Sequence, residues 1–294
     1  MAVAEPDFDT PVEVELPPLG SQPLGSGPLG SGPLASRRVL GMRVDATSYD
    51  DIVERVIAWA RNGEARAVGV ATVNNVMESH DDEGFLRVMN ALDVNTPDGM
   101  PLVWGLRWLG VRDATRVYGP AMTPLVLERA AREGIPVGFY GGSEQVLAEL
   151  RDHATSTYPG IRIAFSESPP FRALTDDEER ATAAAIAASG AKIVFVGLGC
   201  PKQERWMERN RHRIPAVTLG VGAAFDFLTG RKRQAPPLLQ RAGLEWLFRL
   251  VTEPRRLWRR YLRHNPRFIV LFARQLLRER DRGTGSDSTN GGST

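Results

Sequence analysis

The feature that most constrains the fold is a regular alternation of short β-branched runs with longer helical segments. The expected strands cover residues 39–44, 67–73, 136–140, 162–165, 192–196 and 216–219, and the expected helices lie near residues 49–61, 99–109, 121–133, 143–157, 175–189 and 202–212. This alternation, with continuous apolar strands such as IVFVG, is typical of a parallel sheet that is buried on both faces. The sequence therefore predicts an α/β fold with a Rossmann-like, mostly parallel sheet and helices on both faces.

The two ends of the chain differ from this pattern. Residues 18–36 repeat a five-residue unit, PLGSQ-PLGSG-PLGSG-PLAS, which cannot bury enough apolar surface to offset the entropy of ordering. We expect residues 1–36 to be a disordered tail, and residues 282–294 (RGTGSDSTNGGST) to be a second one for the same reason. Between them we expect an α/β domain over residues 37–253 and a basic, amphipathic C-terminal appendage over residues 254–281.

Composition excludes several classes of protein. Hydrophobic residues at 42% and charged residues at 24% are ordinary for a soluble globular chain, and no apolar run reaches the ~18–20 residues of a membrane span. The first residues, MAVAEPDFDT, are acidic and lack the apolar core of a secretory signal. A single cysteine, Cys200, excludes an intramolecular disulfide and a cysteine zinc site. We therefore expect a cytoplasmic protein.

The net charge of +2 hides an asymmetry along the chain. Residues 231–294 carry 15 Lys and Arg against 5 Asp and Glu, whereas residues 1–230 carry 22 against 30. On a helical wheel that starts at Pro254, apolar and basic side chains separate; the apolar side has Leu257, Trp258, Tyr261 and Leu262, and the basic side has Arg255, Arg256, Arg259, Arg260 and Arg263. Pro266 is expected to interrupt this helix before a second apolar segment, which contains Phe268, Ile269, Leu271 and Phe272.

Three interpretations of this basic end are open. A basic amphipathic helix with aromatic residues binds an anionic membrane surface, where each basic residue contributes about 1 kcal/mol. Alternatively, the apolar stripe packs against the α/β domain. Arginines interleaved with aromatic residues also suit nucleic acid, so a nucleic-acid-binding protein without catalytic activity is one rival hypothesis, although we expect no nucleic-acid partner.

Candidate binding residues follow the expected strands, because ligands of open α/β sheets bind beyond the carboxyl ends of the strands. The loops in question are residues 72–75, 95–99, 116–119, 140–143, 197–204 and 220–226. Four of them place glycine beside an expected helix start, where free N–H groups and the helix dipole favour phosphate. Together they predict a nucleotide or sugar-phosphate crevice, with candidate residues Thr96, Gly141, Gly142, Gly197, Gly199 and Lys202.

Each candidate also has a purely structural interpretation. Asp98 could only place negative charge at a helix start, Arg116 could be salt-bridged, and the glycines could be turn residues. Cys200 has no nearby histidine to activate it, which favours a small buried residue, and the four histidines lack metal-ligand spacing. A dinucleotide fingerprint that starts at Gly197 fails, because Lys202 stands where glycine is required. A Rossmann-like oxidoreductase, the other rival, is therefore disfavoured.

A set of motifs follows in order along the chain, within a stretch of about residues 37–275. It consists of T-x-N, TPDG, R-x-x-G, GG, GLGxPKQE, GxGxxFD, and GLEW followed by R-x-x-x-EP. The set resembles the WecG/TagA/CpsF glycosyltransferase family, most specifically in GLGCPKQERW and in GVGAAFDFLTGRKRQAPPLLQRAGLEWLFRLVTEPRR. The resemblance implies transfer of N-acetylmannosamine or its uronic acid from a UDP-sugar to a polyprenyl-pyrophosphate-linked sugar. It also implies inversion at the anomeric carbon, no metal, and a role in surface polysaccharide or teichoic-acid biosynthesis.

The resemblance also implies roles for individual residues. Asp98 matches the family's proposed base, Thr72 and Asn74 match positions that line the sugar site, and Arg116 matches an arginine near the diphosphate. Gln203 and Asp226 match positions that contact the nucleotide-sugar. Arg249, Arg256 and Arg259 match arginines that the family's C-terminal segment brings over the active site, while it helps the enzyme to reach its lipid-linked acceptor. Cys200 stands where the family also has Ala or Ser, which agrees with a structural thiol.

The residues are compatible with this chemistry. Inverting transfer needs one general base, and positive charge or N–H donors on the leaving diphosphate. The only D-x-D motif, which in other transferases holds a divalent ion, is residues 7–9 in the expected tail. Arginines and helix N-termini are then expected to hold the diphosphate, with no metal and no cofactor. The expected partners are a UDP-amino sugar, a polyprenyl-pyrophosphate-linked acceptor and the inner face of the cell membrane; homo-oligomerisation is left open.

Overall fold

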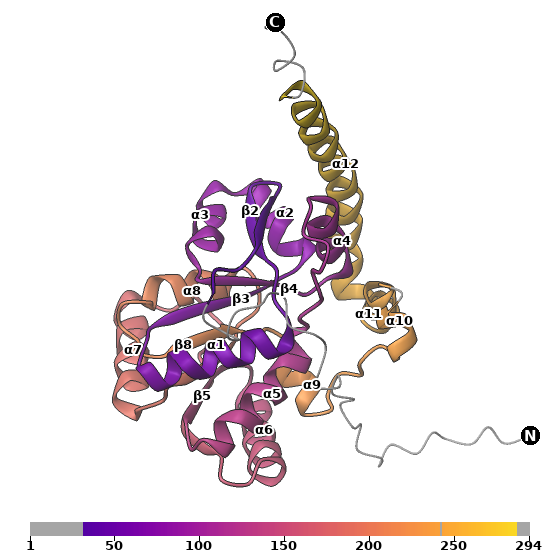
Figure 1. Ribbon diagram of the computed structural model, residues 1–294. Helices are drawn as coiled ribbons and strands as arrows, with labels where there is room; N and C mark the ends of the chain where they lie inside the picture. The colour runs from indigo at the N-terminus through magenta and orange to yellow at the C-terminus, as the bar shows by residue number, and fades with distance from the viewer. Residues whose placement is uncertain (1–31, 242, 287–294) are drawn as a thin grey trace, which may run out of the picture.

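The computed structural model describes residues 32–241 and 243–286 (Figure 1). Most of the two expected tails, including the Pro-Gly-Ser repeat up to residue 31 and residues 287–294, lies outside the described residues.

The centre of the molecule is a six-stranded sheet in the order β4-β3-β8-β7-β5-β6. All neighbouring strands are parallel, and their bounds are Arg66–Ala71 (β3), Val94–Pro97 (β4), Pro136–Gly141 (β5), Arg162–Glu167 (β6), Ile193–Gly197 (β7) and Val217–Gly220 (β8). Side chains alternate between two buried layers. In β7, Ile193 and Phe195 join one hydrophobic core, while Val194 and Val196 join the other. The apolar strands of the sequence thus form a sheet that is covered on both faces.

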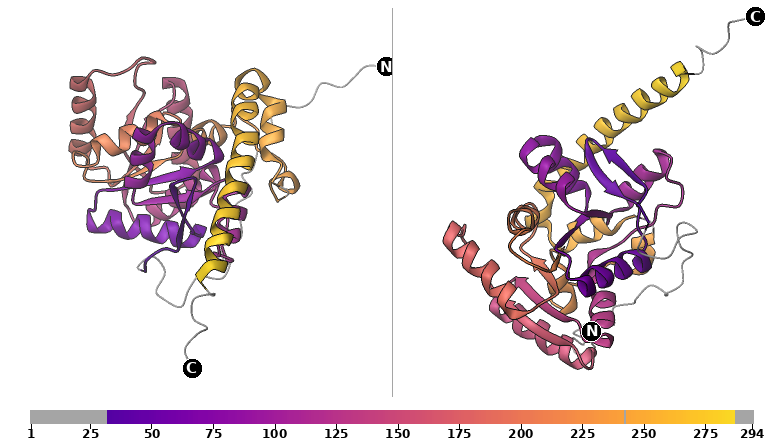
Figure 2. Two further views of the ribbon diagram at one scale, coloured as in Figure 1. Left: turned by 90° about the horizontal axis from the view of Figure 1, so that it is seen from above. Right: turned by 60° about the vertical axis from the view of Figure 1, so that its left-hand side comes forward.

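Helices cover both faces of this sheet (Figures 1 and 2). One core includes residues of α1 (Tyr49–Asn62), α5 (Gly119–Arg132), α6 (Glu144–Thr157) and α9 (Ala224–Leu228). The other includes residues of α2 (Val73–Asp81), α3 (Glu83–Ala91), α4 (Met100–Trp108), α7 (Asp176–Ser189) and α8 (Lys202–Asn210). The predicted α/β class and the helices on both faces are confirmed.

The prediction of one strand over residues 39–44 is wrong. The chain forms an antiparallel hairpin there, apart from the main sheet, with strands β1 (Ser36–Val39) and β2 (Met42–Asp45). Leu40 and Gly41 form the turn, both with positive φ, of 49° and 92°. Glycine adopts this conformation without strain, so Gly41 was the turn signal inside the apolar run.

The prediction also omitted β4, α2 and α3. β4 has the sequence VNTP, in which the polar residues are buried: the Asn95 N–H donates to Asp45 Oδ2 at 2.7 Å, and Asn95 Nδ2 donates to the Met89 carbonyl at 2.7 Å. A strand whose polar groups are satisfied by distant residues has no apolar signature. The two helices did carry a signal, since Thr72 and Asp82 are N-caps with side-chain hydrogen bonds.

The C-terminal part forms α10 (Pro237–Arg241), α11 (Glu245–Thr252) and the long helix α12 (Pro254–Ser286). The expected interruption at Pro266 is wrong, because α12 continues through it and ends five residues beyond the expected appendage. The continuous helix α12 packs on the domain. It runs along α2 and α4 (Figures 1 and 2), and Arg267 pairs with Asp81 of α2 at 2.6 Å.

The two sides of α12 differ in burial. Leu257, Phe268 and Phe272 are 0%, 4% and 3% exposed, and both phenylalanines belong to the core on the α2 face of the sheet. Trp258, Leu262 and Ile269 are 46%, 66% and 67% exposed. The helical wheel placed Leu257 and Trp258 on the same side of the helix, but in the structure Leu257 is buried and Trp258 is exposed. Part of the apolar stripe therefore packs on the domain. Among the described helices, none is long and apolar enough to cross a membrane.

Candidate active site

The carboxyl ends of β4, β3, β8, β7 and β5 lie along one edge of the sheet, because these adjacent strands are parallel. The loops that leave this edge carry most of the predicted site residues: Asp98 after β4, Thr72 and Asn74 after β3, Asp226 after β8, Gly199, Lys202 and Gln203 after β7, and Gly142 after β5. The residues predicted from strand-end loops thus lie along one edge of the sheet.

Asp98 directly follows β4 and is held by its backbone and its side chain. Its N–H donates to the Ala71 carbonyl of β3 at 2.8 Å. Arg116 Nε donates to the Asp98 carbonyl at 2.6 Å, and Arg116 Nη2 donates to Asp98 Oδ1 at 3.1 Å. The N-cap of α4 is Gly99, which makes no side-chain cap bond. The Asp98 carboxylate therefore binds an arginine instead of capping the helix.

A second carboxylate shares the same arginine. Arg116 Nη2 is 2.5 Å from Glu245 Oε2, and Glu245 is the first residue of α11, 129 positions further along the chain. The Arg116 guanidinium lies 4.4 Å from the centre of the Tyr118 ring. The GLEW motif contains Glu245 and was the only sequence signal for a functional residue at this position. No role was predicted for Glu245.

Arg249 of α11 joins this cluster one turn after Glu245. Its guanidinium lies 5.7 Å from the centre of the Phe227 ring, and its Nε is buried without a hydrogen-bond partner. Its charge and that of Asp98 influence each other's pKa. The predicted residues Asp98, Arg116 and Arg249 are thus brought together, with a free donor on Arg249. We call Asp98, Arg116, Glu245 and Arg249 the acid–arginine cluster.

Burial governs the electrostatics of this cluster. Burial and, to a smaller extent, the negative charge of Glu245 raise the pKa of Asp98 to about 6, against the opposing effect of Arg116. Burial alone would lower the pKa of Arg116, but the two carboxylates raise it above its ordinary value. Burial also raises the pKa of Tyr49, whose Oη accepts from the Tyr118 N–H at 3.0 Å, to about 12. A carboxyl with a pKa near neutrality is suited to accept a proton.

Thr72 and Asn74 differ in how far their polar atoms are engaged. The Thr72 hydroxyl caps α2 in a reciprocal arrangement with Asn75. Asn74 Nδ2 donates to Cys200 Sγ at 3.4 Å, while Asn74 Oδ1 is buried without a partner. Burial raises the pKa of the Cys200 thiol, which agrees with a structural and unreactive residue. Asn74 is the one of the two with an unused acceptor.

Gln203 connects two of the loops. Its Oε1 accepts from the N–H groups of Gly199 and Gly222, both at 3.1 Å, and its Nε2 donates to Glu204 Oε1 at 3.0 Å. Glu204 Oε1 also accepts from Asn75 Nδ2 at 3.0 Å, so this buried carboxylate extends the connection to α2. The Gln203 carbonyl oxygen thus connects the loop after β7 with the loop after β8, and its amide nitrogen is bound by Glu204.

Several predicted residues are packed against the protein itself. A Cβ on Gly141 would lie 2.7 Å from Gly197, and a Cβ on Gly197 would lie 2.6 Å from the Phe225 ring. Thr96 is fully buried, and its hydroxyl donates to the Gly69 carbonyl at 3.5 Å. Three of the remaining candidates are less tightly packed: a Cβ on Gly142 would lie no closer than 3.4 Å to a neighbour, a Cβ on Gly199 would meet nothing within 4 Å, and Lys202 is exposed as the first residue of α8.

Asp226 and Arg256 belong to a second set of charges. Lys232 Nζ is 2.7 Å from Asp226 and 3.7 Å from Glu253, which in turn pairs with Arg256. The guanidinium of Arg259 lies 5.3 Å from the Trp258 ring centre. Arg256 thus pairs with Glu253, just before α12, and Arg259 contacts Trp258 of α12 itself. Of the three predicted arginines, Arg249 is the one that joins Asp98.

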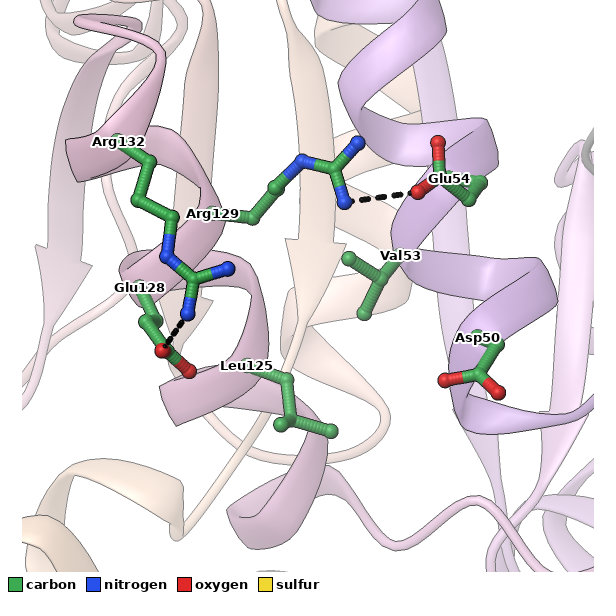
Figure 3. Close-up of a pocket in the computed structure, with 7 residues that line it drawn as sticks. All are labelled: Asp50, Val53, Glu54, Leu125, Glu128, Arg129 and Arg132. Carbon is green, nitrogen blue, oxygen red and sulfur yellow. Dashed lines mark hydrogen bonds and ion pairs between the residues drawn. The ribbon is translucent and has the colours of Figure 1, made fainter. Parts of the chain in front are cut away.

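A small pocket of about 150 Å³ lies elsewhere, between α1 and α5 (Figure 3). Its arginines are engaged, since Arg129 Nη1 is 2.8 Å from Glu54 and Arg132 pairs with Glu128. It contains none of the predicted site residues. Within residues 32–241 and 243–286, no group of three or more His, Cys, Asp or Glu side chains is placed to hold a metal ion; the Asp7-Phe8-Asp9 motif lies outside these ranges.

Two comparisons relate the chain to known proteins. The family model described as "Glycosyl transferase WecG/TagA/CpsF family" matches residues 37–282. A curated N-acetylglucosaminyldiphosphoundecaprenol N-acetyl-beta-D-mannosaminyltransferase from Bacillus spizizenii (strain W23) is 34% identical over 186 residues, which cover 63% of this chain and 70% of the relative.

Proposed function

Because the chain belongs to the WecG/TagA/CpsF family and is a glycosyltransferase, we propose that it transfers an N-acetylmannosamine-type sugar from a UDP-sugar to a polyprenyl-pyrophosphate-linked acceptor. The name of the Bacillus relative gives that protein an N-acetylglucosaminyl-diphosphoundecaprenol substrate and an N-acetylmannosaminyl group. The product belongs to cell-envelope polysaccharide or teichoic-acid-like biosynthesis. Inversion, the UDP donor and independence from metal are parts of this proposal.

The observation that carries the proposal is the buried Asp98 carboxylate, with a pKa of about 6, at the carboxyl edge of the sheet. In the reaction, an acceptor hydroxyl gives its proton to Asp98 while its oxygen forms a bond to the anomeric carbon of the donor sugar. The bond from that carbon to the diphosphate oxygen breaks, and UDP leaves with the electron pair. Attack opposite to the leaving group inverts the anomeric centre, and a single base suffices.

The leaving diphosphate needs positive charge, and arginines supply it in this proposal. Arg249 has an unpartnered Nε beside Asp98, and Arg256 and Arg259 are exposed on the first turns of α12. A planar guanidinium binds phosphate oxygens through two parallel hydrogen bonds. Lys202, the exposed first residue of α8, adds a cationic donor after β7. No metal ion is required for this stabilisation.

The exposed side of α12 fits a lipid-linked acceptor. Trp258 and Leu262 are exposed near Arg255, Arg259 and Arg263, a combination that binds the interface of an anionic bilayer. We propose that the enzyme works peripherally at the cytoplasmic face of the membrane, where the polyprenyl chain of the acceptor is embedded.

The experiment that tests this function is incubation with a panel of UDP-sugars and a short-chain prenyl-pyrophosphate-sugar acceptor, with products identified by mass spectrometry. We expect transfer of an N-acetylmannosamine-type sugar, and NMR of the product should show an inverted anomeric configuration. Asp98→Asn is expected to lower turnover by roughly 10²–10⁴-fold, while Asp113→Asn, at an exposed position, keeps it unchanged. Near-normal turnover of Asp98→Asn would disprove the assignment of the base, and absence of any sugar transfer would disprove the substrate class.

A further inference from the structure

We infer that Glu245 of α11 is a positioning residue for the proposed base. It competes with Asp98 for the Arg116 guanidinium and so sets the basicity of Asp98. The inference rests on the proposed function, since it takes Asp98 as the base. It adds a residue that neither the motif assignments nor the comparisons identify.

Asp98 and Glu245 share one guanidinium group. The same nitrogen, Arg116 Nη2, is 3.1 Å from Asp98 Oδ1 and 2.5 Å from Glu245 Oε2, so the contact to Glu245 is the shorter one. Arg116 Nε is used by the Asp98 carbonyl at 2.6 Å. Arg116 therefore stays beside Asp98 through the main chain, while its Nη2 contacts both carboxylates and lies closer to Glu245.

The three side chains of this contact are largely buried. The side chains of Asp98, Arg116 and Glu245 are 15%, 16% and 12% exposed. Glu245 is also the buried residue of α11, whose other side chains are partly or fully exposed. A carboxylate on a surface helix is placed in a low-dielectric site only if a partner compensates for its lost hydration. That partner is the arginine that also holds the proposed base.

Charges of both signs surround Asp98. The groups that face it are Arg116 before α5, Glu245 and Arg249 of α11, and the tyrosines Tyr49 of α1 and Tyr118 at the start of α5. Two carboxylates thus oppose two guanidinium groups. Removal of the Glu245 charge would leave Asp98 as the only anion beside two cations, which would stabilise its deprotonated form and make it a weaker base.

A purely structural role makes a different prediction. If Glu245 only anchored α11 to the domain, its loss would lower activity by the same factor at every pH. If it sets the basicity of Asp98, its loss would move the acid limb of the pH–rate profile. The pH profile of kcat/KM therefore separates the two roles, because its acid limb reports the base of the free enzyme.

The test compares wild type, Glu245→Gln and the matched control Glu149→Gln, which removes a carboxylate from an exposed pair with Arg231. We expect a wild-type acid limb near pH 6, a limb about one pH unit lower in Glu245→Gln, and a control profile that superimposes on wild type. A Glu245→Gln limb that coincides with wild type would overturn the inference.

If circular dichroism shows that Glu245→Gln does not fold, Glu245→Asp replaces it. This variant withdraws the carboxylate from Arg116 by one methylene, so the acid limb of its pH profile should also fall below that of wild type. A limb that coincides with wild type would overturn the inference here too.

Failure of the proposed function would look different. In that case wild type would transfer no sugar, or Asp98→Asn would keep the activity and the same acid limb. An active wild type whose acid limb disappears in Asp98→Asn, together with an unmoved limb in the Glu245 variant, would reject the positioning role alone.

Discussion

Replacement of Phe272 by alanine tests whether α12 is part of the folded core. Phe272 is 3% exposed, lies 5.6 Å from Phe268 and 6.3 Å from Trp108 between ring centres, and sits against Gly105 of α4. Gly105 leaves room for the ring, because a Cβ there would lie 3.2 Å from it. The substitution would create a cavity between α4 and α12.

The expected loss follows from this burial. Truncation of a buried phenylalanine to alanine costs about 3–5 kcal/mol of unfolding free energy, a large part of the ~5–15 kcal/mol that stabilises a typical domain. For a domain of this size 1 kcal/mol corresponds to about 2–4 °C, so the melting temperature should fall by roughly 6–20 °C. The matched control is Ile269→Ala on the same helix, because Ile269 is 67% exposed. Its effect should stay within about 0.5 kcal/mol.

Thermal unfolding of the full chain, followed by circular dichroism, measures both variants. A large decrease for Phe272→Ala and a negligible one for Ile269→Ala would support a packed α12. Equal shifts in the two variants, or no shift in either, would refute it and would favour a helix that detaches from the domain. Truncation after Glu253 removes the same contacts together with those of Leu257 and Phe268, and is expected to destabilise the domain in the same way.

Two further predictions concern the metal and the membrane. EDTA in the transfer assay should leave the rate unchanged, because arginines supply the positive charge in the proposed mechanism; a loss that only Mn²⁺ or Mg²⁺ reverses would contradict it. The double substitution Trp258→Ser with Leu262→Ser should weaken co-sedimentation with phosphatidylglycerol vesicles and spare transfer to a short-chain soluble acceptor, whereas Phe171→Ser, which also removes an exposed apolar side chain, should change neither. Unaltered sedimentation of the double variant would place the membrane contact elsewhere.

The buried strands could be predicted from the sequence because burial on both faces requires continuous β-branched runs. β7 is the clearest case, with IVFVG feeding both cores. β4 escaped the same reasoning because its second residue, Asn95, is buried by hydrogen bonds to Asp45 and Met89. Those partners come from other elements, so the stabilisation of β4 is tertiary and leaves no local pattern.

Some residues of the candidate site could likewise be predicted from the sequence, and others could not. Asp98 and Arg116 could be located because strand-end loops converge at one edge of a parallel sheet. Glu245 could not, because an acidic residue at a helix start is common on protein surfaces; only the fold brings it within 2.5 Å of Arg116. Conversely, Gln203 was predicted as a substrate contact from a motif and Thr96 from a strand-end loop. The structure shows what else they do, since their polar groups bond to neighbouring loops and strands. Their contact with substrate stays a prediction.

The C-terminal helices connect the proposed base with the proposed membrane surface. α11 contributes Glu245 and Arg249 to the acid–arginine cluster, and α12 follows it after a single residue. Because Phe272 anchors α12 in the core and Glu245 is bound to Arg116, both helices are held relative to Asp98 by contacts with the domain. Substitutions on the buried side of α12 should therefore reduce transfer to soluble and membrane-bound acceptors alike, whereas substitutions on its exposed side, such as at Trp258, should affect only acceptors that are embedded in a bilayer. This difference follows from the packing of α12 and could not follow from a detached amphipathic helix.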